Sequence, residues 1–278
     1  MLAAVSPEEF QWIRQFMHDN TGVVIQSGKE HLVASRLAAL LQQNGCPNFT
    51  HLFQKLARDA GVLGVQVVDA LTTHETLWFR DETFFNALAD EILPRLVKKA
   101  RHRGSVRIWS AATATGQEAY SVAMLLDAVG RKRDPDFDLN QYFILGTDIS
   151  LSSLSIARQG RYNHLALSRG MRAEFLARYF ERKGDEHQLI PSIRRVVRFE
   201  PFNLKESFSS LGTFDLILCR NVLIYFDENL KRQICRRMRT TLVRPDGYFA
   251  IGASESLLDL DVGFEQIVVG RAALYQTA

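Results

Sequence analysis

Apolar side chains in the first part of the chain recur every three to four residues, the spacing of one helix face. Ser6-Pro7-Glu8-Glu9 has the form of a capping box with proline at the first helical position, so a helix is predicted to begin there. Further helices are predicted over 29–41, from Phe49 with Thr50 as its cap, and over 65–71. In the second helix, five residues are expected to form one apolar face: Leu32, Val33, Leu37, Leu40 and Leu41. Because no stretch here alternates like a strand, residues 1–72 are predicted to form an all-α domain.

A short run of polar and aromatic residues follows, TTHETLWFRDETFF, and residues 73–85 are interpreted as a connector. Its aromatic residues are assigned to a core between the two domains: Trp78, Phe79, Phe84 and Phe85. Asp81 is expected to cap the next helix. Arg80 can form a salt bridge or serve a binding site, and the residues alone leave this open.

Residues 86–278 show apolar strands alternating with helical segments, which predicts an α/β domain. The segment VRIWSAATATGQEAYSVAMLL, residues 106–126, passes from a strand through small residues to Gly116 and then into a helix. Such a strand–loop–helix unit can hold a nucleotide-like ligand at the helix N-terminus. It has one glycine where the dinucleotide fingerprint has three, so a hydride-transfer cofactor is not implied, and a simple turn without a ligand stays possible.

Polar residues follow the later strands where each strand is expected to end. Asp148 closes QYFILGTD, Asn203 follows VVRFEPF, and Arg220-Asn221 follow FDLILC. Open α/β sheets bind ligands at the carboxyl ends of their strands, and an acidic residue after the second strand is placed to accept hydrogen bonds from a ribose diol. Residues 161–195 break the alternation and are predicted to be an insertion at the edge of the sheet.

Composition narrows the class of protein. Lys and Arg exceed Asp and Glu by three, and the locally basic KRQICRRMR is expected to be a solvated helix face with Ile234 and Met238 inward. Cys46, Cys219 and Cys235 have neither disulfide nor metal spacing, so no metal site is predicted. Without a signal peptide or an apolar run of about 20 residues, we expect a cytoplasmic protein with no membrane insertion.

Basic residues near the N-terminus allow two interpretations. Lys29 and Arg36 would share one face of their helix, with Arg14 and His18 near them in sequence. They could form a modest basic surface for an acidic partner, although scattered solvated charges are the commoner explanation.

Four motifs, in this order and spacing, resemble the chemotaxis receptor methyltransferases of the CheR type: TTHETLWFRDETFF, RIWSAATATGQEAYSVAMLL, GTDIS and FDLILCRNVLIYFD. The resemblance extends over nearly the whole chain. It implies a Rossmann-like class I S-adenosylmethionine-dependent methyltransferase domain with a small β-subdomain insertion, preceded by an all-α domain. It also implies methylation of glutamate side chains in the cytoplasmic helices of chemoreceptors, with S-adenosylhomocysteine as the product.

The family motifs also imply site residues. Cofactor contacts are expected at His74, Thr76, Arg80, Ala112, Glu118, Asp148, Asn203, Leu204, Arg220 and Asn221. In this interpretation Asp148 binds the ribose, Asn203 the adenine edge and Glu118 the amino group of the methionine part. Arg80 and Tyr225 are expected beside the transferred methyl group as the catalytic residues. A glutamate needs no general base because it is already ionised at neutral pH, although Tyr225 could equally have only a packing role.

The chain departs from the family pattern in three places. His74 stands where the family usually has asparagine, and it could bind the cofactor or weaken its binding. The loop AATATGQEAYS replaces the commoner ACSTGEEPYS but keeps Gly116 and Glu118. FERKGDEHQLIPS has a single glycine where relatives that bind a receptor's C-terminal pentapeptide have a glycine-spaced loop. We therefore expect the protein to dock directly on the receptor's methylation helices and not to bind the C-terminal pentapeptide. We also expect it to be a monomer.

Three alternatives remain at this point. One is a methyltransferase serving twitching motility or another chemosensory array. Another is a non-catalytic scaffold that binds S-adenosylmethionine and signals by docking. A nucleic-acid methyltransferase is disfavoured because Arg220-Asn221-Val222 replaces the (N/D)PP(Y/F) motif and no extended basic track is present.

Overall fold

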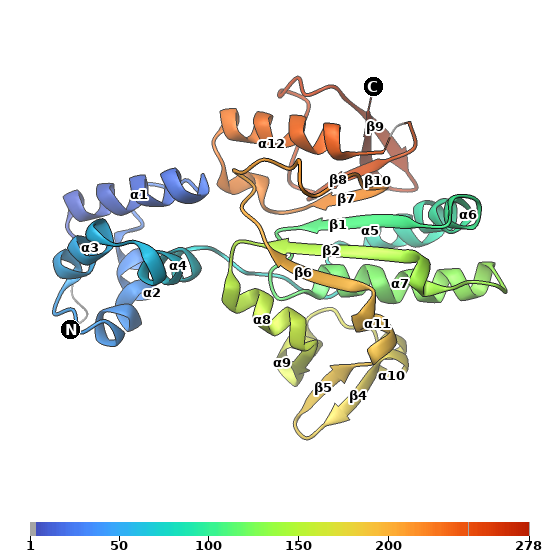
Figure 1. Ribbon diagram of the computed structural model, residues 1–278, viewed down its shortest axis with the longest axis horizontal. Coiled ribbons are helices and arrows are strands. Elements are labelled where there is room, and N and C mark those ends of the chain that lie inside the picture. The colour runs from blue at the N-terminus through green and yellow to red at the C-terminus, as the bar shows by residue number, and fades with distance from the viewer. Residues whose placement is uncertain (1–3, 244, 278) are drawn as a thin grey trace.

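The computed structural model describes residues 4–243 and 245–277, in which an all-helical N-terminal domain faces one end of a larger α/β domain (Figure 1). Four helices build the N-terminal domain: α1 (Pro7–Thr21), α2 (Glu30–Gln43), α3 (Phe49–Arg58) and α4 (Gly61–Leu71). Ser6 and Glu9 form the predicted capping box of α1. The predicted start of α3 is wrong by two residues, because Asn48 and not Thr50 accepts the capping hydrogen bond, from the His51 N–H.

The expectation that α4 spans only 65–71 is also wrong, since the helix begins at Gly61. Its N-cap residue, Ala60, makes no side-chain cap, so the sequence carries no start signal there. Leu32 of α2 differs from the prediction as well, because it is 37% exposed while Val33 and Leu37 are buried. It lines a cavity between the two domains.

The connector leads into a nearly continuous helical stretch made of α5 (Glu82–Ala87), the π-helical turn η1 (Leu88–Ile92) and α6 (Leu93–Arg103). Asp81 caps α5 as predicted, accepting a hydrogen bond from the Phe84 N–H. The assignment of the connector aromatics to a core between the domains is wrong. They belong to the core of the α/β domain, and Trp78 packs edge-on against Tyr162 and Phe180 of the insertion, with ring centroids 4.9 and 5.6 Å apart.

Within the described residues, the central sheet has seven strands in the order β6-β2-β1-β7-β8-β10-β9. Their bounds are β1 (Val106–Ala111), β2 (Tyr142–Asp148), β6 (Val197–Pro201), β7 (Leu216–Cys219), β8 (Tyr248–Ile251), β9 (Phe264–Val269) and β10 (Ala272–Thr277). Strands β6, β2, β1, β7 and β8 are parallel, whereas β10 pairs antiparallel with β8 and β9. The strand order reverses between β1 and β7, which opens a crevice at their carboxyl ends.

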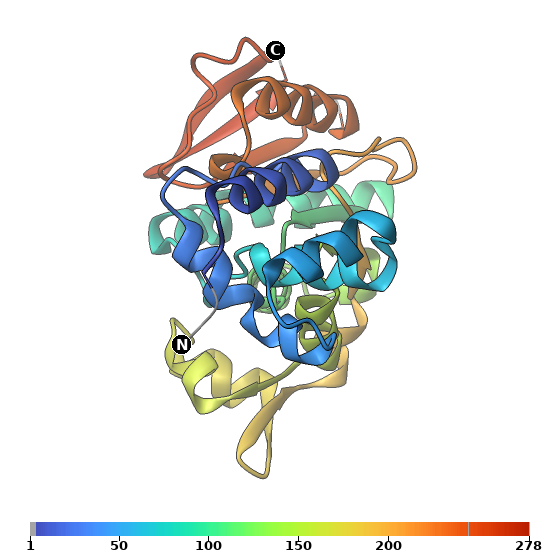
Figure 2. The same ribbon diagram turned by 90° about the vertical axis from the view of Figure 1, so that its left-hand side faces the viewer.

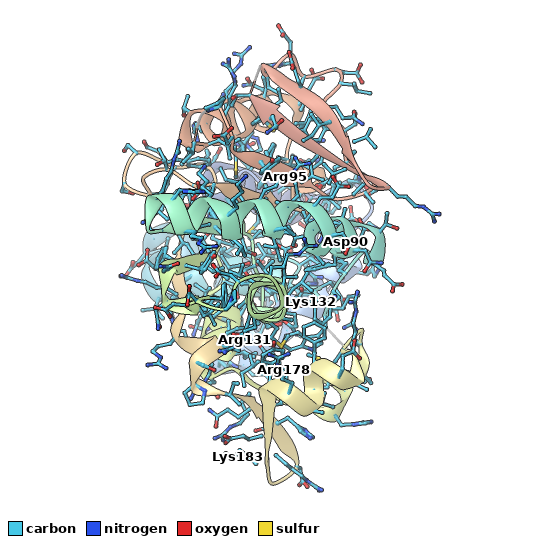
Figure 3. The ribbon with its side chains drawn as sticks, turned by 90° about the vertical axis from the view of Figure 1, so that its right-hand side faces the viewer. Asp90, Arg95, Arg131, Lys132, Arg178 and Lys183 are labelled. Atoms are coloured by element: carbon cyan, nitrogen blue, oxygen red, sulfur yellow. The ribbon has the colours of Figure 1, made fainter. Side chains whose placement is uncertain are left out.

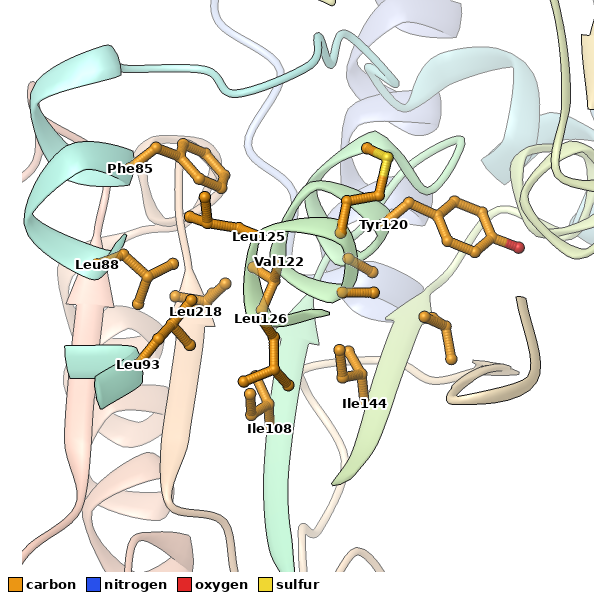
Figure 4. Packing of buried hydrophobic residues seen from close by; sticks show 14 of the residues in the cluster. Phe85, Leu88, Leu93, Ile108, Tyr120, Val122, Leu125, Leu126, Ile144 and Leu218 are labelled. Atoms are coloured by element: carbon orange, nitrogen blue, oxygen red, sulfur yellow. The ribbon is translucent and has the colours of Figure 1, made fainter. Parts of the chain in front are cut away.

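Helices cover both faces of this sheet and bury its apolar residues. Besides α5 and α6, the helical segments that pack on the sheet include α7 (Gln117–Arg133), η2 (Leu139–Gln141), α8 (Leu151–Gln159), η3 (Leu223–Tyr225) and α12 (Glu228–Thr241). Figure 4 shows α7 packing Val122 and Leu126 against Ile108 of β1, with Phe85 and Leu88 alongside. On the other face α12 turns Ile234 and Met238 inward, as predicted. The expected α/β fold behind an all-α domain is confirmed.

Residues 161–195 form a subdomain between α8 and β6, the strand at one edge of the sheet. It contains β3 (Arg161–Asn163), α9 (His164–Ser168), α10 (Ala173–Tyr179), β4 (Phe180–Lys183), β5 (Glu186–Leu189) and α11 (Pro191–Arg195), with β5 between β3 and β4. Figures 1 and 2 show this subdomain at the opposite end of the α/β domain from α12 and β9.

A buried carboxylate fastens this subdomain to α7. Asp127 accepts hydrogen bonds from Arg131 Nε (2.9 Å) and the Tyr179 hydroxyl (3.0 Å), and Arg178 Nη2 lies 3.5 Å from it. Arg131 and Arg178 lie close together on the face turned away from the N-terminal domain (Figure 3). The two arginines thus balance a buried charge, and Tyr179 and Arg178 connect the insertion to α7.

Candidate functional site

A cavity of about 500 Å³ lies between the N-terminal domain and the carboxyl ends of the parallel strands. This volume falls in the range of about 300–1,000 Å³ that is typical of small-molecule sites. Every residue that the family motifs predict for the site lines it: His74, Thr76, Arg80, Ala112, Glu118, Asp148, Asn203, Leu204, Arg220, Asn221 and Tyr225. The fold therefore brings together residues from the connector and from the ends of four strands.

The loop between β1 and α7 forms one wall, and its backbone is unusually tight. Ala112 and Ala114 have left-handed φ values of 56° and 50°, and both line the cavity. Gly116 has φ 92°, and a Cβ there would lie 2.9 Å from Ala157 Cβ of α8. The glycine thus allows the loop to pack on α8 while α7 begins at the next residue.

Asp148 ends β2 with its side chain almost fully buried at 6% exposure. Its Oδ2 accepts a hydrogen bond from the Ala114 N–H (2.8 Å), and its Oδ1 accepts one from the Ser150 N–H (2.9 Å). Burial raises the pKa of this carboxyl above its usual range, because desolvation outweighs these hydrogen bonds and the nearby His74. Each oxygen has a second lone pair, so the carboxylate keeps the capacity to accept two hydroxyl donors.

Arg220, at the end of β7, is the centre of a buried charge cluster. Its Nη1 donates to Glu118 Oε2 (3.1 Å) and its Nη2 lies 3.3 Å from Asp81 Oδ2, while the guanidinium stacks 4.2 Å from the Phe84 ring. Ser110 Oγ donates to the other oxygen of Glu118 (2.8 Å). Two carboxylates surround one guanidinium, so the cluster carries one excess negative charge that an ammonium group would balance.

Arg80 and Tyr225 approach the cavity from different elements. Arg80 lies in the connector, half-buried, and its Nη1 donates a long hydrogen bond to the Glu75 carbonyl (3.3 Å). Tyr225 ends η3, and its backbone carbonyl accepts a hydrogen bond from the Val24 N–H of the N-terminal domain (2.8 Å). The Arg80 guanidinium thus retains most of its donors for a ligand.

Asn203 lies two residues beyond the end of β6 and is tied to the N-terminal domain. Its Nδ2 donates to the Asn20 carbonyl (2.7 Å), and its Oδ1 accepts from the Lys205 N–H (3.0 Å). The amide that was expected to contact adenine therefore also holds the two domains together. Leu204, which follows it, is buried.

His74 lines the cavity and contacts the end of α4 through one ring nitrogen. Its Nε2 lies 3.0 Å from the Asp69 carbonyl and 3.1 Å from Thr72 Oγ1, both at the end of α4. The Asp69 side chain in turn bonds Ser150 Oγ, beside Asp148. In the tautomer that donates from Nε2, the Nδ1 atom remains as an acceptor.

The wall contributed by the N-terminal domain is not predicted from the sequence. Val23 forms a β-bridge with Phe226, and Val24, Ile25, Leu32 and Arg36 also line the cavity. The basic residues considered earlier are mostly engaged: Arg14 Nε donates to the Ile25 carbonyl (2.7 Å), Arg36 Nη1 to the Leu71 and Thr72 carbonyls (2.9 and 3.0 Å), and His18 pairs with Asp227 (3.0 Å). The available signal was the apolar segment Val23-Val24-Ile25, which follows α1 after Gly22.

The donors and acceptors of this cavity fit S-adenosylmethionine. Asp148 can accept hydrogen bonds from a ribose diol, and the negative excess around Glu118 suits an amino group. Within residues 4–243 and 245–277, no cluster of side chains suits a metal ion, and no helix is long and apolar enough to cross a membrane.

Comparisons with known proteins agree with this fit. The family described as CheR methyltransferase, SAM binding domain, matches residues 74–272, and the one described as CheR methyltransferase, all-alpha domain, matches residues 8–72. The chain is 40% identical to chemotaxis protein methyltransferase 1 of Pseudomonas aeruginosa, over 96% of this chain and 97% of that protein. It is also 40% identical to chemotaxis protein methyltransferase 1 of Vibrio cholerae, over 98% of each. The chain therefore belongs to the CheR family of chemotaxis methyltransferases and uses S-adenosylmethionine as its cofactor.

Proposed function

We propose that this methyltransferase forms methyl esters on glutamate side chains in the cytoplasmic helices of chemoreceptors. The observation that carries the proposal is Arg80, a permanently charged group that lines the cofactor cavity and donates only a long hydrogen bond to a described backbone carbonyl. A carboxylate is costly to remove from water unless it is paired, and arginine pairs with it in a planar geometry without losing its own charge. The names of the similar proteins support a substrate in chemotaxis.

The proposed reaction requires little from the protein beyond alignment. Bound S-adenosylmethionine supplies a methyl group on a positively charged sulfur. The glutamate is ionised at neutral pH, so no residue has to remove a proton before its oxygen attacks. Arg80 would hold this carboxylate and the Tyr225 hydroxyl would donate a further hydrogen bond to it, while the apolar wall of Val23, Val24 and Leu32 limits access of water.

Asp148, Glu118 and Arg220 would fix the cofactor on the opposite side. Asp148 is the proposed ribose acceptor, Glu118 the partner of the amino group, and Arg220 the balancing charge. Ala112, Asn203, Leu204 and Asn221 would shape the remaining wall, together with His74 and Thr76 of the connector.

The test uses the purified chain, cofactor labelled on its methyl group, and the cytoplasmic fragment of a chemoreceptor. We expect label on glutamates of the fragment, located by mass spectrometry and released as methanol in alkali because it is an ester. A fragment with those glutamates changed to alanine is the matched control. Cofactor binding without transfer would favour a docking scaffold, and alkali-stable label would point to another acceptor group.

A further inference from the structure

Glu255 lies outside the cavity but binds the loop that follows β7. It comes four residues after the end of β8, and its half-buried carboxylate turns toward the neighbouring strand. Oε2 accepts hydrogen bonds from the Asn221 N–H (2.8 Å) and the Gly252 N–H (2.6 Å), and Oε1 accepts one from the Ile224 N–H (3.3 Å). One side chain thus satisfies backbone donors at both ends of the segment 221–224.

The segment needs this support because its backbone is irregular. Asn221 has φ 59°, in the left-handed region, directly after the buried end of β7. The close approach of the two strand ends also depends on Gly252, where a Cβ would lie 2.5 Å from Asn221 Nδ2 and 2.8 Å from Glu255 Oε2. A charged acceptor makes hydrogen bonds about twice as strong as a neutral one. The carboxylate is therefore well suited to hold a conformation that the chain does not favour by itself.

The two ends of this loop are held independently. Arg220, before it, is fixed by Glu118, Asp81 and Phe84, so its place does not depend on Glu255. Tyr225, after it, is held through its backbone alone among the described contacts. Its N–H donates to the Val222 carbonyl of the same loop (3.1 Å), and its carbonyl accepts from the Val24 N–H (2.8 Å). Loss of the Glu255 contacts would therefore displace Tyr225 more than Arg220.

We propose that Glu255 is a positioning residue for methyl transfer, whose carboxylate fixes the loop 221–225 so that the Tyr225 hydroxyl meets the methyl acceptor. This rests on the proposed function for the part played by Tyr225. Glu255 itself does not line the cavity, so its effect passes through the backbone it binds.

The test compares Glu255→Gln with Glu265→Gln. The control makes the same chemical change at an exposed position on β9 whose side chain forms no hydrogen bond or ion pair with the described part of the chain. Turnover is followed as release of S-adenosylhomocysteine in the presence of the receptor fragment, and affinity for S-adenosylhomocysteine is measured by calorimetry. Hydrogen exchange at the Asn221 and Ile224 amides reports the loop without any substrate.

For Glu255→Gln we expect faster exchange at both amides and a kcat lowered by about 10–100-fold, the scale of a misplacement of about 1 Å. Affinity for S-adenosylhomocysteine should fall by a smaller factor than kcat, because Asn221 lines the cavity but Glu118 and Arg220 are held without Glu255. In a Tyr225→Phe background, Glu255→Gln should lower kcat by a smaller factor. Both substitutions remove the same contact, that of the Tyr225 hydroxyl with the methyl acceptor. Glu255→Asp, which keeps the charge, should restore part of the rate and serves if the glutamine variant folds poorly.

An unchanged kcat, unchanged amide exchange, or an equal loss of rate in both backgrounds would each overturn the proposal. Mapping the methylated side chain tests the proposed function separately. Methyl groups on a residue other than glutamate would refute the glutamate assignment while leaving the comparison of the Glu255 variants intact.

Discussion

Replacing Asp148 with asparagine changes one atom of the cavity wall and tests its proposed part in cofactor binding. The native carboxylate already accepts one backbone hydrogen bond on each oxygen, from Ala114 and Ser150, and keeps one acceptor position on each for the ribose. Asparagine has a single acceptor oxygen, and its NH₂ group would face either a backbone N–H or a ribose hydroxyl. At least one hydrogen bond to a charged acceptor is lost, worth about 1.5–3 kcal/mol.

This loss corresponds to a Kd for S-adenosylmethionine raised by about 10–150-fold at 25 °C. Calorimetric titration of the Asp148→Asn variant measures it directly. Asp215→Asn is the matched control, because Asp215 is also buried but pairs with Lys99 (2.7 Å) and the Arg107 N–H (2.7 Å) at the other end of β1 and β7. The control should lose stability and keep its affinity. An Asp148→Asn variant that binds as tightly as the native protein would remove Asp148 from the ribose site.

Three further outcomes are expected. Arg80→Ala should lower kcat by about 100-fold or more if Arg80 pairs with the reacting carboxylate, while thermal unfolding changes little because the only hydrogen bond described for its side chain is long. Arg220→Met should lower the free energy of unfolding by about 3–5 kcal/mol, since it leaves Glu118 and Asp81 unpaired; denaturant titration measures this. Lowering the pH from 7 toward 4 should weaken cofactor binding to the native chain. Because its pKa is raised, Asp148 takes up a proton at a higher pH than an exposed carboxyl does and then loses its charge as an acceptor.

The pH dependence of folding stability that arises from Asp148 is opposite in sign to that of cofactor affinity. A carboxyl whose pKa is raised by folding favours the folded state as it takes up its proton, so the contribution of Asp148 to stability rises as the pH falls through that pKa. Affinity and this contribution should therefore move in opposite directions, and both trends should be absent in Asp148→Asn. Parallel trends in the two proteins would assign the pH dependence to another group. Likewise, full activity of Arg80→Ala, or native stability of Arg220→Met, would refute the corresponding role.

Local chemistry explains which parts of the fold were predictable. The capping box at Ser6 and the cap at Asp81 act within a few residues, and the buried parallel strands appear as continuous apolar runs. The start of α4 escaped prediction because Ala60 supplies no cap. Trp78 was placed in the wrong core because its partners, Tyr162 and Phe180, belong to an insertion far along the chain.

The candidate site likewise contains residues that the sequence predicts and residues that it does not. Motif residues at strand ends gather in one cavity because parallel strands end at the same edge of a sheet. Their individual roles stay predictions. The N-terminal wall depends on the bridge between Val23 and Phe226, and Glu255 acts through backbone amides of another strand. Neither contact leaves a periodic pattern in the sequence.

The cavity crosses the boundary at which the chain divides into two recognisable sequence units. The match for the all-α unit ends at residue 72 and the match for the cofactor-binding unit begins at residue 74, yet Val23, Val24 and Leu32 belong to the first and face Asp148 and Arg220 of the second. Excising the larger unit would remove part of the ligand's enclosure along with the Val24 contact to Tyr225. The cofactor-binding unit alone therefore does not contain the complete cavity. Transferring the activity to another protein requires both units together.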